Sequence, residues 1–379
     1  MKIVFKKNVL IEAVSYALCA VSNKNMGTSV QGILIETLAD NICRLSSYDY
    51  DKGLNITIEA NVIEEGNCII NAQRLNQIIR ILPESEIEIS LSGNIACVKS
   101  GKSEFEVASQ RGDEFPSMPE LDTESGFTIK QKVLFKSISQ TLFAVPQNNQ
   151  RQVFTGSLFK IDGRKMTVVG CDGYRLAVKE SLCDMKNAPE NINQRVIIPG
   201  KTLSELMKII GDNDDDITIK ASNKHIVFEV KKKNLLFFSR LLDGEYIDYE
   251  RILPRHFETF VIADNDILLS ALERAALVSE ESTSTGTKSY VRLSIKQDDL
   301  VISSVSAKGK VKDELTIEKE GKDIEILFNC RYLIDSLKAC DSTKVKISLE
   351  SPKIGIIIEP EEAKENEKLT VFVLPVMIK

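Results

Sequence analysis

Few side chains of this sequence have the types and spacing that catalysis or metal binding would require. The only histidines among its 379 residues are His225 and His256, so nucleophile–histidine catalysis and histidine-rich metal sites have little to build on. The best enzyme interpretation pairs Asp172 with Tyr174 or Arg175 as an acid–base site. The Asp-Gly dipeptide at this place is also typical of a simple turn, and no phosphate-binding loop or nucleophile–base pair accompanies it. The residues therefore favour a binding protein that needs no cofactor or metal.

Eight cysteines are scattered along the chain, without a Cys-x-x-Cys pair or a Cys/His cluster. An even number permits disulfides, but a chain that lacks a recognisable secretory leader favours reduced thiols in the core. The N-terminal lysines are not followed by an apolar stretch and a cleavage site of small residues, so we expect a cytoplasmic protein. No apolar run approaches the ~18 residues of a membrane-spanning helix. The cysteines are Cys19, Cys43, Cys68, Cys97, Cys171, Cys183, Cys330 and Cys340.

Basic residues gather in particular segments of an acidic chain. The whole sequence has 49 Lys and Arg against 55 Asp and Glu, a net charge of -6. Yet the segments 6–24, 71–83, 130–151 and 200–211 together hold nine more basic than acidic residues. A basic face on an acidic body suits contact with nucleic-acid phosphates, although no base-reading motif is present. The alternative for each segment is the solvated face of an amphipathic helix.

The elements that must position these residues repeat along the chain. Apolar residues recur at helical spacing in six segments, two in each third of the sequence, and alternating apolar and polar residues predict strands between them. Each third is therefore expected to be an α+β unit, in which an antiparallel sheet backs two helices. The helical segments are 10–21, 75–82, 134–145, 203–210, 268–276 and 333–340.

Two charged tracts invite a more specific interpretation. The acidic tract 212–216 lacks the glycine and the twelfth-position glutamate of a calcium-binding EF-hand loop, which favours a solvated turn between a helix and a strand. The three lysines at 231–233 predict the turn of a hairpin, with a phosphate site as the alternative.

Four motifs carry a family resemblance: Phe-Pro at 115–116, Asp-Gly-Tyr-Arg-Leu-Ala at 172–177, Asp-Gly at 243–244 followed by Asp-Tyr-Glu-Arg-Ile-Leu-Pro at 248–254, and Val-Leu-Pro-Val at 373–376. In this order they make the chain resemble, along its whole length, the β-subunit family of bacterial DNA polymerase III, the sliding clamps. The resemblance implies the DNA clamp fold, with three similar α+β domains expected at 1–120, 121–254 and 255–379. Two chains would close head-to-tail into a ring around double-stranded DNA, as a non-catalytic subunit that gives the replicative polymerase processivity.

Helix geometry gives an independent check on the number of chains in the ring. Helices pack about 8–10 Å apart, so six helices in a circle leave only about 17 Å between opposing axes. Helix bodies about 10 Å wide then leave no room for a duplex. Twelve helices leave about 24 Å clear, enough for B-DNA with its grooves roughly 8 Å deep. One chain cannot encircle DNA, whereas two chains can.

The charge pattern and the resemblance together nominate three sets of residues. The basic residues expected to face DNA are Lys24, Arg74, Arg80, Lys132, Lys136, Arg151, Lys201 and Lys208. In the family, polymerases and the clamp loader insert a short peptide with apolar anchors into a pocket between the second and third domains. The positions that match this pocket are Phe154, Cys171, Gly173, Tyr174, Arg175, Leu176, Ile247, Arg251, Ile252, Phe372, Leu374, Pro375 and Val376. At its rim, Arg175 and Arg251 would meet acidic or carbonyl groups. Ring closure would place Phe105 and Val107 opposite Leu277 and Val278 of the other chain.

Each interpretation has an alternative. Without the resemblance, Leu176, Ile252 and Leu374 would be assigned to an ordinary apolar core. For ring closure, the alternative to the apolar contact is that the acidic segment 264–282 attracts basic residues of the other chain's first domain, which would explain its charge. A scaffold of three repeats with no role in replication is the competing class of protein, and it would not stay trapped on circular DNA.

Overall fold

The computed structural model of the protein describes residues 1–22, 29–121, 126–190, 192–279, 290–306, 309–362 and 364–377. The chain forms two compact units, each drawn from several stretches of sequence. Unit 1 comprises Met1–Phe135, Asp184–Glu190 and Lys201–Leu242, and unit 2 comprises Lys136–Cys183, Asn191–Gly200 and Asp243–Lys379. The boundary divides the middle third of the chain, so the compact units do not coincide with the three expected domains.

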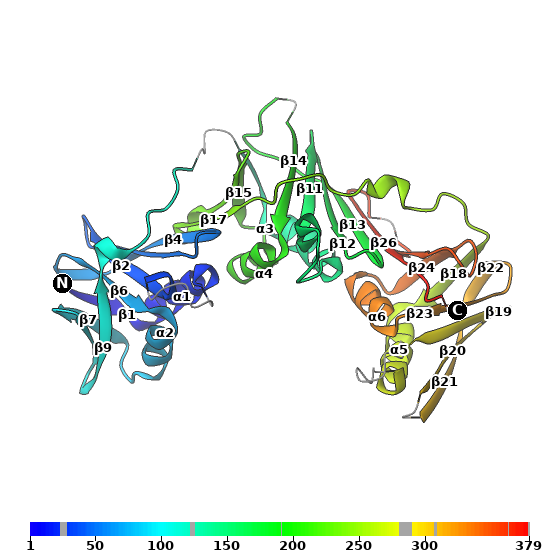
Figure 1. Cartoon of the computed structure of the whole chain (residues 1–379), viewed down its shortest axis with the longest axis horizontal. Helices are drawn as coiled ribbons and strands as arrows, with labels where there is room; N and C mark the ends of the chain where they lie inside the picture. Colours follow the sequence, from blue (N-terminus) through cyan, green and yellow to red (C-terminus); the bar gives the residue numbers. More distant parts are fainter. Residues whose placement is uncertain are drawn as a thin grey trace. The chain divides into compact units, whose positions relative to one another are not determined.

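Unit 1 contains antiparallel strands in the order β10-β15-β16-β17-β4-β3-β2-β6-β9-β8-β7-β1-β5 within the described residues. Helices α1 (Lys7–Ala17) and α2 (Ala72–Ile81) pack against each other, and Figure 1 shows both beside the strands of the first third of the chain. The strands are β1 (Lys2–Lys6), β2 (Gly32–Leu38), β3 (Ile42–Tyr48), β4 (Lys52–Glu59), β5 (Asn61–Glu64), β6 (Asn67–Asn71), β7 (Glu86–Ser92), β8 (Ile95–Ser100), β9 (Ser103–Arg111), β10 (Phe127–Lys130), β15 (Asp216–Ala221), β16 (His225–Val230) and β17 (Leu235–Arg240).

Unit 2 contains two antiparallel sheets in its described part, with the strand orders β14-β11-β12-β13-β26-β25-β24-β18-β22 and β21-β20-β19-β23. Helices α5 (Asn265–Ser279) and α6 (Cys330–Ala339) pack against each other (Figure 1). The strands are β11 (Gly156–Asp162), β12 (Lys165–Cys171), β13 (Arg175–Leu182), β14 (Asn193–Pro199), β18 (Thr259–Asp264), β19 (Val291–Lys296), β20 (Asp299–Ser306), β21 (Gly309–Thr316), β22 (Glu318–Gly321), β23 (Ile324–Phe328), β24 (Lys344–Leu349), β25 (Ile356–Pro360) and β26 (Glu367–Val373).

The two remaining helices belong to the middle third of the chain. The boundary between the units runs through α3 (Gln131–Ser139), whereas α4 (Gly200–Ile209) lies in unit 1 apart from its first residue. All six predicted helices are confirmed. Each buries its apolar stripe, which is the main source of stability for helices of this length.

Local sequence explains how α6 begins and why a serine interrupts its apolar stripe. The side chain of Asn329 accepts a hydrogen bond from the backbone N–H of Arg331 and caps the helix. Ser336 is fully buried among the apolar residues, and its hydroxyl donates to the carbonyl of Tyr332, 2.6 Å away. A serine fits the buried stripe because the helix itself satisfies its hydroxyl.

The third α-helix is shorter than its apolar spacing predicts. It ends at Ser139 and is followed by a separate 3-10 turn at Leu142–Ala144, whereas the periodicity extends to Val145. Pro146 disfavours helical backbone at the residue before it. The carbonyl of Thr141 also approaches Gly170 so closely that a side chain there would clash, because a Cβ would lie 2.4 Å from the oxygen. The chain must turn here to pack on β12.

The two charged tracts form turns, as predicted. Residues 212–215 connect α4 to β15, and Lys231–Lys233 form a 3-10 turn between β16 and β17. Lys233 donates to the Tyr16 hydroxyl and to the Ile209 carbonyl, both at 2.6 Å, and burial lowers its pKa. Because the Lys233 ammonium is already hydrogen-bonded to groups of unit 1, the structure argues against the alternative of a phosphate site.

The middle third joins strands from both ends of the chain. In unit 1, β17 pairs with β4, and in unit 2, β13 pairs with β26.

All eight cysteines are free, and all except Cys97 are buried. In the described part of the chain, we find no helix that is long and apolar enough to cross a membrane.

Candidate DNA and peptide-binding sites

The basic residues expected to face DNA lie on helices or beside one. Lys24 falls outside the described residues. Lys136 on α3 is half-buried, and the other six side chains are exposed to solvent. These six are Arg74 and Arg80 on α2, Lys132 on α3, Arg151 before the 3-10 turn Gln152–Thr155, and Lys201 and Lys208 on α4.

Ion pairs divide the exposed residues into two groups. Lys132 Nζ lies 2.6 Å from Asp214 Oδ1, and Lys208 Nζ lies 2.6 Å from Glu205 Oε2. No ion pair links Arg74, Arg80, Arg151 or Lys201 to an acidic residue in the described part of the chain. These four positive charges are therefore the most available for phosphate groups.

Lys136 does not fit the expectation of a solvent-facing DNA contact. Its Nζ lies 2.9 Å from Asp341 Oδ2 and 3.3 Å from Glu367 Oε2. Burial lowers the pKa of Lys136, but the hydrogen bond that its ammonium donates to Asp341 and the nearby Glu367 carboxylate outweigh burial and raise the pKa above the ordinary value. The residue acts within unit 2 as a link from α3 to β26 and to the turn after α6.

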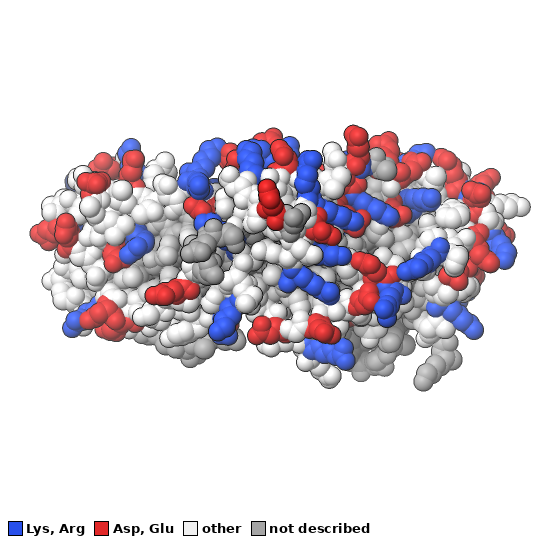
Figure 2. Space-filling model, turned by 90° about the horizontal axis from the view of Figure 1, so that it is seen from above, with Lys and Arg blue, Asp and Glu red and all other residues white. Residues whose placement is uncertain are grey.

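Acidic and basic side chains are interspersed over the face of the molecule in Figure 2. Neither sign forms a continuous field on this face. This face is therefore not a uniformly acidic surface.

The predicted peptide-binding residues on strands come together in unit 2. Arg175 and Leu176 at the start of β13 pair with Val373 and Phe372 at the end of β26. The backbone N–H of Leu374 extends this ladder, because it donates to the Tyr174 carbonyl at 2.9 Å. Segments 171–176 and 372–376, almost 200 residues apart in sequence, are thus neighbours.

Burial separates this set into an exposed layer and a supporting layer. Tyr174, Leu374 and Ile252 are 58%, 38% and 36% exposed, which is unusual for large apolar side chains. Gly173 and Arg251 are also exposed, and Phe154, Ile247, Pro375 and Val376 are half-buried. The supporting layer is Cys171, Leu176 and Phe372, all buried. Burial raises the pKa of the Cys171 thiol.

The predicted peptide-binding residues of the segment 243–254, which links β17 to β18, also lie in unit 2. The Phe154 ring meets the Tyr246 ring edge-on, with centroids 5.7 Å apart. The buried Tyr246 hydroxyl lies 3.3 Å from the carbonyls of Gly156 and Val169, and so ties the linker to β11 and β12. Arg251 pairs with Asp248 at 2.9 Å and is otherwise in solvent. This fits the expectation that Arg251 lies at a rim.

Arg175, by contrast, is not a rim residue. Its side chain is only 12% exposed, and its guanidinium lies 3.0 Å from Asp172 and 2.8 Å from Asp335. It also donates to the Phe143 carbonyl at 2.5 Å and stacks 4.5 Å from the centre of the Tyr332 ring. These contacts leave little of the guanidinium for a ligand, so Arg175 holds β13 to the helices of unit 2.

Asp335, Tyr332 and Phe143 are site residues that sequence reasoning missed. Tyr332 also stacks on the exposed Tyr174, with ring centroids 6.3 Å apart. Asp335 lies 160 residues from Arg175, and no motif or spacing connects the two positions. Only the folded chain shows that Asp335 holds Arg175 and that Tyr332 stacks on Tyr174.

The residues predicted for ring closure lie on two separate elements. Phe105 and Val107 are half-buried on β9, and their stretch of β9 pairs with β8 on one side only in the described chain. On α5, Leu277 is 73% exposed and Val278 is half-buried. β21, which packs beside α5, is an edge strand of its sheet in the described part of unit 2. In the described residues, β9 and β21 thus offer the free strand edges that pairing between chains requires.

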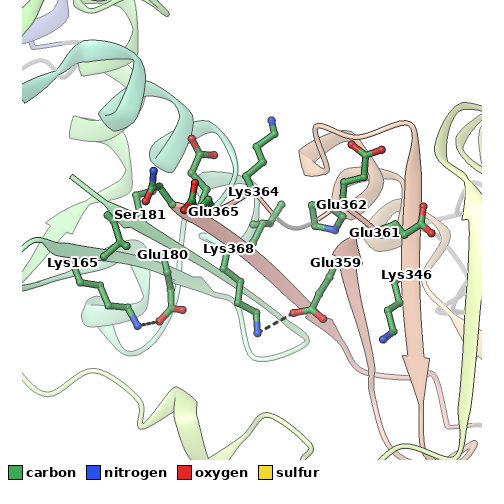
Figure 3. Close-up of a pocket in the computed structure, with 15 residues that line it drawn as sticks. Lys165, Glu180, Ser181, Lys346, Glu359, Glu361, Glu362, Lys364, Glu365 and Lys368 are labelled. Carbon is green, nitrogen blue, oxygen red and sulfur yellow. Dashed lines mark ion pairs between the residues drawn. The ribbon is translucent and has the colours of Figure 1, made fainter. Parts of the chain in front are cut away.

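A polar pocket of about 620 Å³ lies at the other end of the β13–β26 pairing (Figure 3). Lys165 pairs with Glu180 at 2.5 Å, and Lys368 pairs with Glu359 at 3.3 Å, as the dashed lines show. None of the residues predicted for peptide binding lines this pocket. Six glutamates and four lysines line it, so its chemistry differs from that of the apolar surface around Tyr174 and Leu374.

No group of three or more His, Cys, Asp or Glu side chains in the described ranges is arranged to hold a metal ion. The two candidate surfaces are therefore the exposed basic side chains on and beside the helices, and the exposed apolar side chains where β13 pairs with β26.

Comparison with known proteins identifies the class. Models of the N-terminal, central and C-terminal domains of the DNA polymerase III beta subunit match residues 1–119, 128–248 and 250–376. The beta sliding clamp of Bacillus subtilis is 31% identical over 99% of both chains, and that of a Staphylococcus epidermidis strain is 30% identical with the same coverage. The crystal structure of the B. subtilis clamp covers all of both chains with a TM-score of 0.91 and 29% identity. The beta subunit of Streptococcus pyogenes gives 0.90 and 28% with the same coverage.

The repeated helix-and-sheet architecture and these full-length matches define a DNA clamp. The chain belongs to the DNA polymerase III beta-subunit family, the bacterial sliding clamps. It is therefore a non-catalytic processivity subunit of the replicative polymerase, which works with double-stranded DNA, polymerases and the clamp loader as a homodimer.

Proposed function

We propose that two copies of the chain close into a ring in the cytoplasm, each contributing three clamp domains at 1–120, 121–254 and 255–379. Leaving DNA would require an interface to open, whereas sliding requires only that weak phosphate contacts exchange. The observation that carries the proposal is the match of three successive segments, over nearly the whole chain, to sliding clamps.

Diffuse contacts to DNA would come from the exposed basic residues on and beside the helices. Arg74, Arg80, Arg151 and Lys201 are the leading candidates because they make no ion pair with a described acid. Lys132 and Lys208 would exchange their carboxylate partners for phosphate, and Lys24 completes the set. Lys136 is a weaker candidate, because two carboxylates already hold its ammonium.

Partner proteins would dock a short peptide on the exposed apolar side chains of unit 2. Tyr174, Ile252 and Leu374 would contact apolar anchors of the peptide, while Arg251 would meet its polar groups at the rim. The buried Leu176 and Phe372 would support this layer from below. Arg175 would act as a positioning residue, since it links Asp172 before β13 to Asp335 on α6.

Ring closure would pair the free edge of β9 with a strand edge of the other chain's third domain. Phe105 and Val107 would then lie opposite Leu277 and Val278 in a small apolar contact flanked by backbone pairing. Two acids, Glu273 on α5 and Asp313 on the neighbouring β21, are already paired within unit 2, because Glu273 contacts Lys338 and Asp313 contacts Arg274. This leaves less free negative charge to attract the other chain.

Topological retention tests the proposed function directly. The clamp would be loaded onto nicked circular plasmid, and its retention compared before and after linearisation of the same molecules. A ring stays on the circle and is lost from the free ends of the linear form. Equal loss from both forms would contradict encirclement and favour a scaffold of three repeats.

A further inference from the structure

Unit 1 contains a second copy of the backbone that forms the candidate peptide surface. In unit 2, the turn before β13 is held by Asp172, whose Oδ1 accepts from the N–H groups of Tyr174 at 2.8 Å and Arg175 at 2.9 Å. In unit 1, the turn before β4 is held by Asp49, whose Oδ1 accepts from Asp51 at 3.1 Å and Lys52 at 2.8 Å. The same four-residue turn therefore occurs twice.

In each turn, the basic residue at the end forms an ion pair with the aspartate at the start. Lys52 Nζ lies 2.7 Å from Asp49 Oδ2, as Arg175 Nε lies 3.0 Å from Asp172 Oδ2. The N–H of each aspartate also donates to the carbonyl of this basic residue, at 3.0 Å in unit 1 and 3.2 Å in unit 2. Lys52 thus corresponds to Arg175.

The strand beside each turn also corresponds, residue by residue. Lys52 pairs with Ser239 of β17, as Arg175 pairs with Val373 of β26. The next backbone N–H then donates to the turn in both units. That bond runs from Arg240 to the Asp51 carbonyl at 2.7 Å in unit 1, and from Leu374 to the Tyr174 carbonyl at 2.9 Å in unit 2. Asp51 and Arg240 therefore occupy the positions of Tyr174 and Leu374.

An apolar base lies below this backbone in unit 1 as well. Tyr48 and Phe238 are buried next to each other, with ring centroids 5.8 Å apart, and the partly buried Met118 and Leu121 pack against their cluster. Tyr50 adds an exposed ring, 5.5 Å from Tyr48, although its φ of 71° is unusual for a bulky residue. The equivalent Gly173 adopts φ 89° without this cost. Unit 1 therefore has the support that an apolar ligand needs.

The two copies differ in the residues that face solvent. Tyr174 and Leu374 present apolar surface, whereas Asp51 and Arg240 are exposed charges. An apolar anchor placed on unit 1 would have to remove a carboxylate and a guanidinium from water, which is costly without a charged partner. Selectivity against a ligand is often achieved in this way, by charges that its contact would desolvate.

We propose that Asp51 and Arg240 close the unit 1 copy to apolar peptides, so that each chain presents a single peptide site, in unit 2. This inference rests on the proposed docking of partner peptides at Tyr174 and Leu374. It makes these two pairs of positions the determinants of where the peptide binds, on a backbone that both units share.

A residue swap tests the inference by counting bound peptides. The probe is the tightest binder among overlapping decapeptides of the same organism's replicative polymerase, labelled with fluorescein and titrated by anisotropy. We expect one peptide per chain for the unaltered clamp and at least tenfold weaker binding for Tyr174→Asp with Leu374→Arg. We expect two peptides per chain for Asp51→Tyr with Arg240→Leu, and one per chain when all four substitutions are combined.

The controls separate the possible failures. Asp162→Tyr with Arg164→Leu adds the same side chains at another exposed turn and should leave one peptide per chain. A second peptide bound to this variant would overturn the inference, because it would show that any exposed Tyr and Leu bind the peptide non-specifically. A count that stays at one for Asp51→Tyr with Arg240→Leu overturns it as well. If that variant does not fold, Asp51→Phe with Arg240→Met serves in its place. Unchanged binding by Tyr174→Asp with Leu374→Arg would instead contradict the proposed docking site itself.

Discussion

The ammonium nitrogen of Lys179 on β13 lies 2.7 Å from Oε2 of Glu367 on β26. Lys179 is 3% exposed, and burial lowers its pKa, whereas the paired carboxylate holds its charge in place. The same carboxylate contacts Lys136 on α3. The strand pairing that positions the candidate peptide surface is thus reinforced, at its other end, by a charge network in which the Lys179 ammonium is buried and Glu367 is partly exposed.

Removing one charge of this network should destabilise unit 2. Glu367→Gln leaves Lys179 buried beside a neutral amide, and breaking a buried pair costs about 3–5 kcal/mol. Because Glu367 keeps 30% of its side chain exposed, we expect a loss of about 2 kcal/mol in the free energy of unfolding. Urea denaturation measures it, and the exposed Glu365→Gln should change stability by less than about 0.5 kcal/mol. Equal stability of the two variants would show that the network contributes little.

The same network predicts how stability depends on pH. The hydrogen bond from Lys136 lowers the pKa of Asp341. Burial alone would raise the pKa of Glu367, but its pairing with Lys179 outweighs burial and lowers it. A carboxyl group whose pKa is lower in the folded chain stabilises the fold above its unfolded pKa of about 4, and this contribution disappears as the pH falls through the folded pKa.

We therefore expect the free energy of unfolding to fall as the pH drops below about 5. The fall should be smaller for Glu367→Gln, because that variant lacks one of the two carboxyl groups. Urea titrations at pH 7, 5, 4 and 3 would measure both curves, with Glu365→Gln as the control for a carboxyl group outside the network. Parallel curves for all three proteins would exclude Glu367 as a source of the acid sensitivity.

Basic residues that pair with no acid among the described residues give the cleanest test of DNA contact. Arg151→Glu and Lys201→Glu should each weaken retention on nicked circular DNA and reduce the salt dependence of binding by about one ion. Thermal unfolding should not change, since both side chains are exposed. Lys99→Glu makes the same charge reversal on the exposed face of β8 and should leave retention intact. If Lys99→Glu weakens retention as much, the effect is one of net charge rather than of a DNA-facing surface.

Lys136 shows which part of the DNA-facing set could not be predicted from the sequence. The helical spacing places Lys136 on α3 correctly, since periodicity is a local property. Its partners Asp341 and Glu367 are more than 200 residues away, and no motif links them to it. The charge reversal Lys136→Glu would place a third carboxylate beside these two. It would therefore test stability rather than DNA contact.

The peptide surface shows the same division between local and distant information. The turn at Asp172 is visible in the sequence, and the family resemblance supplies the match to 372–376. The roles of Tyr332 and Asp335 depend on how α6 packs next to Arg175, which only tertiary structure shows. The early end of α3 at Ser139 likewise reflects Pro146 and the close approach of Gly170, both of which override the apolar periodicity.

The C-terminal segment should be needed for peptide binding but not for dimer formation. Deleting 374–379 removes Leu374 and its hydrogen bond to Tyr174, together with the bond from Val376 to Leu327. We expect peptide binding to be lost and the dimer to remain, as measured by anisotropy and by analytical ultracentrifugation of the same samples. Met377→Ala, which trims an exposed side chain of the same segment, should bind peptide nearly as well as the unaltered chain. Retained affinity in the deletion variant would move the peptide site elsewhere.

The free edge of β9 should be needed to close the ring. Val107→Glu would bury a carboxylate without a partner in the predicted apolar contact, and an unpaired buried charge is strongly unfavourable. We expect the dimer to dissociate at protein concentrations at least tenfold higher than for the unaltered chain, as measured by sedimentation equilibrium. Val62→Glu introduces the same charge at a half-buried position on β5 and should leave the dimer intact. If Val107→Glu dissociates no more readily than Val62→Glu, the edge of β9 does not form the interface.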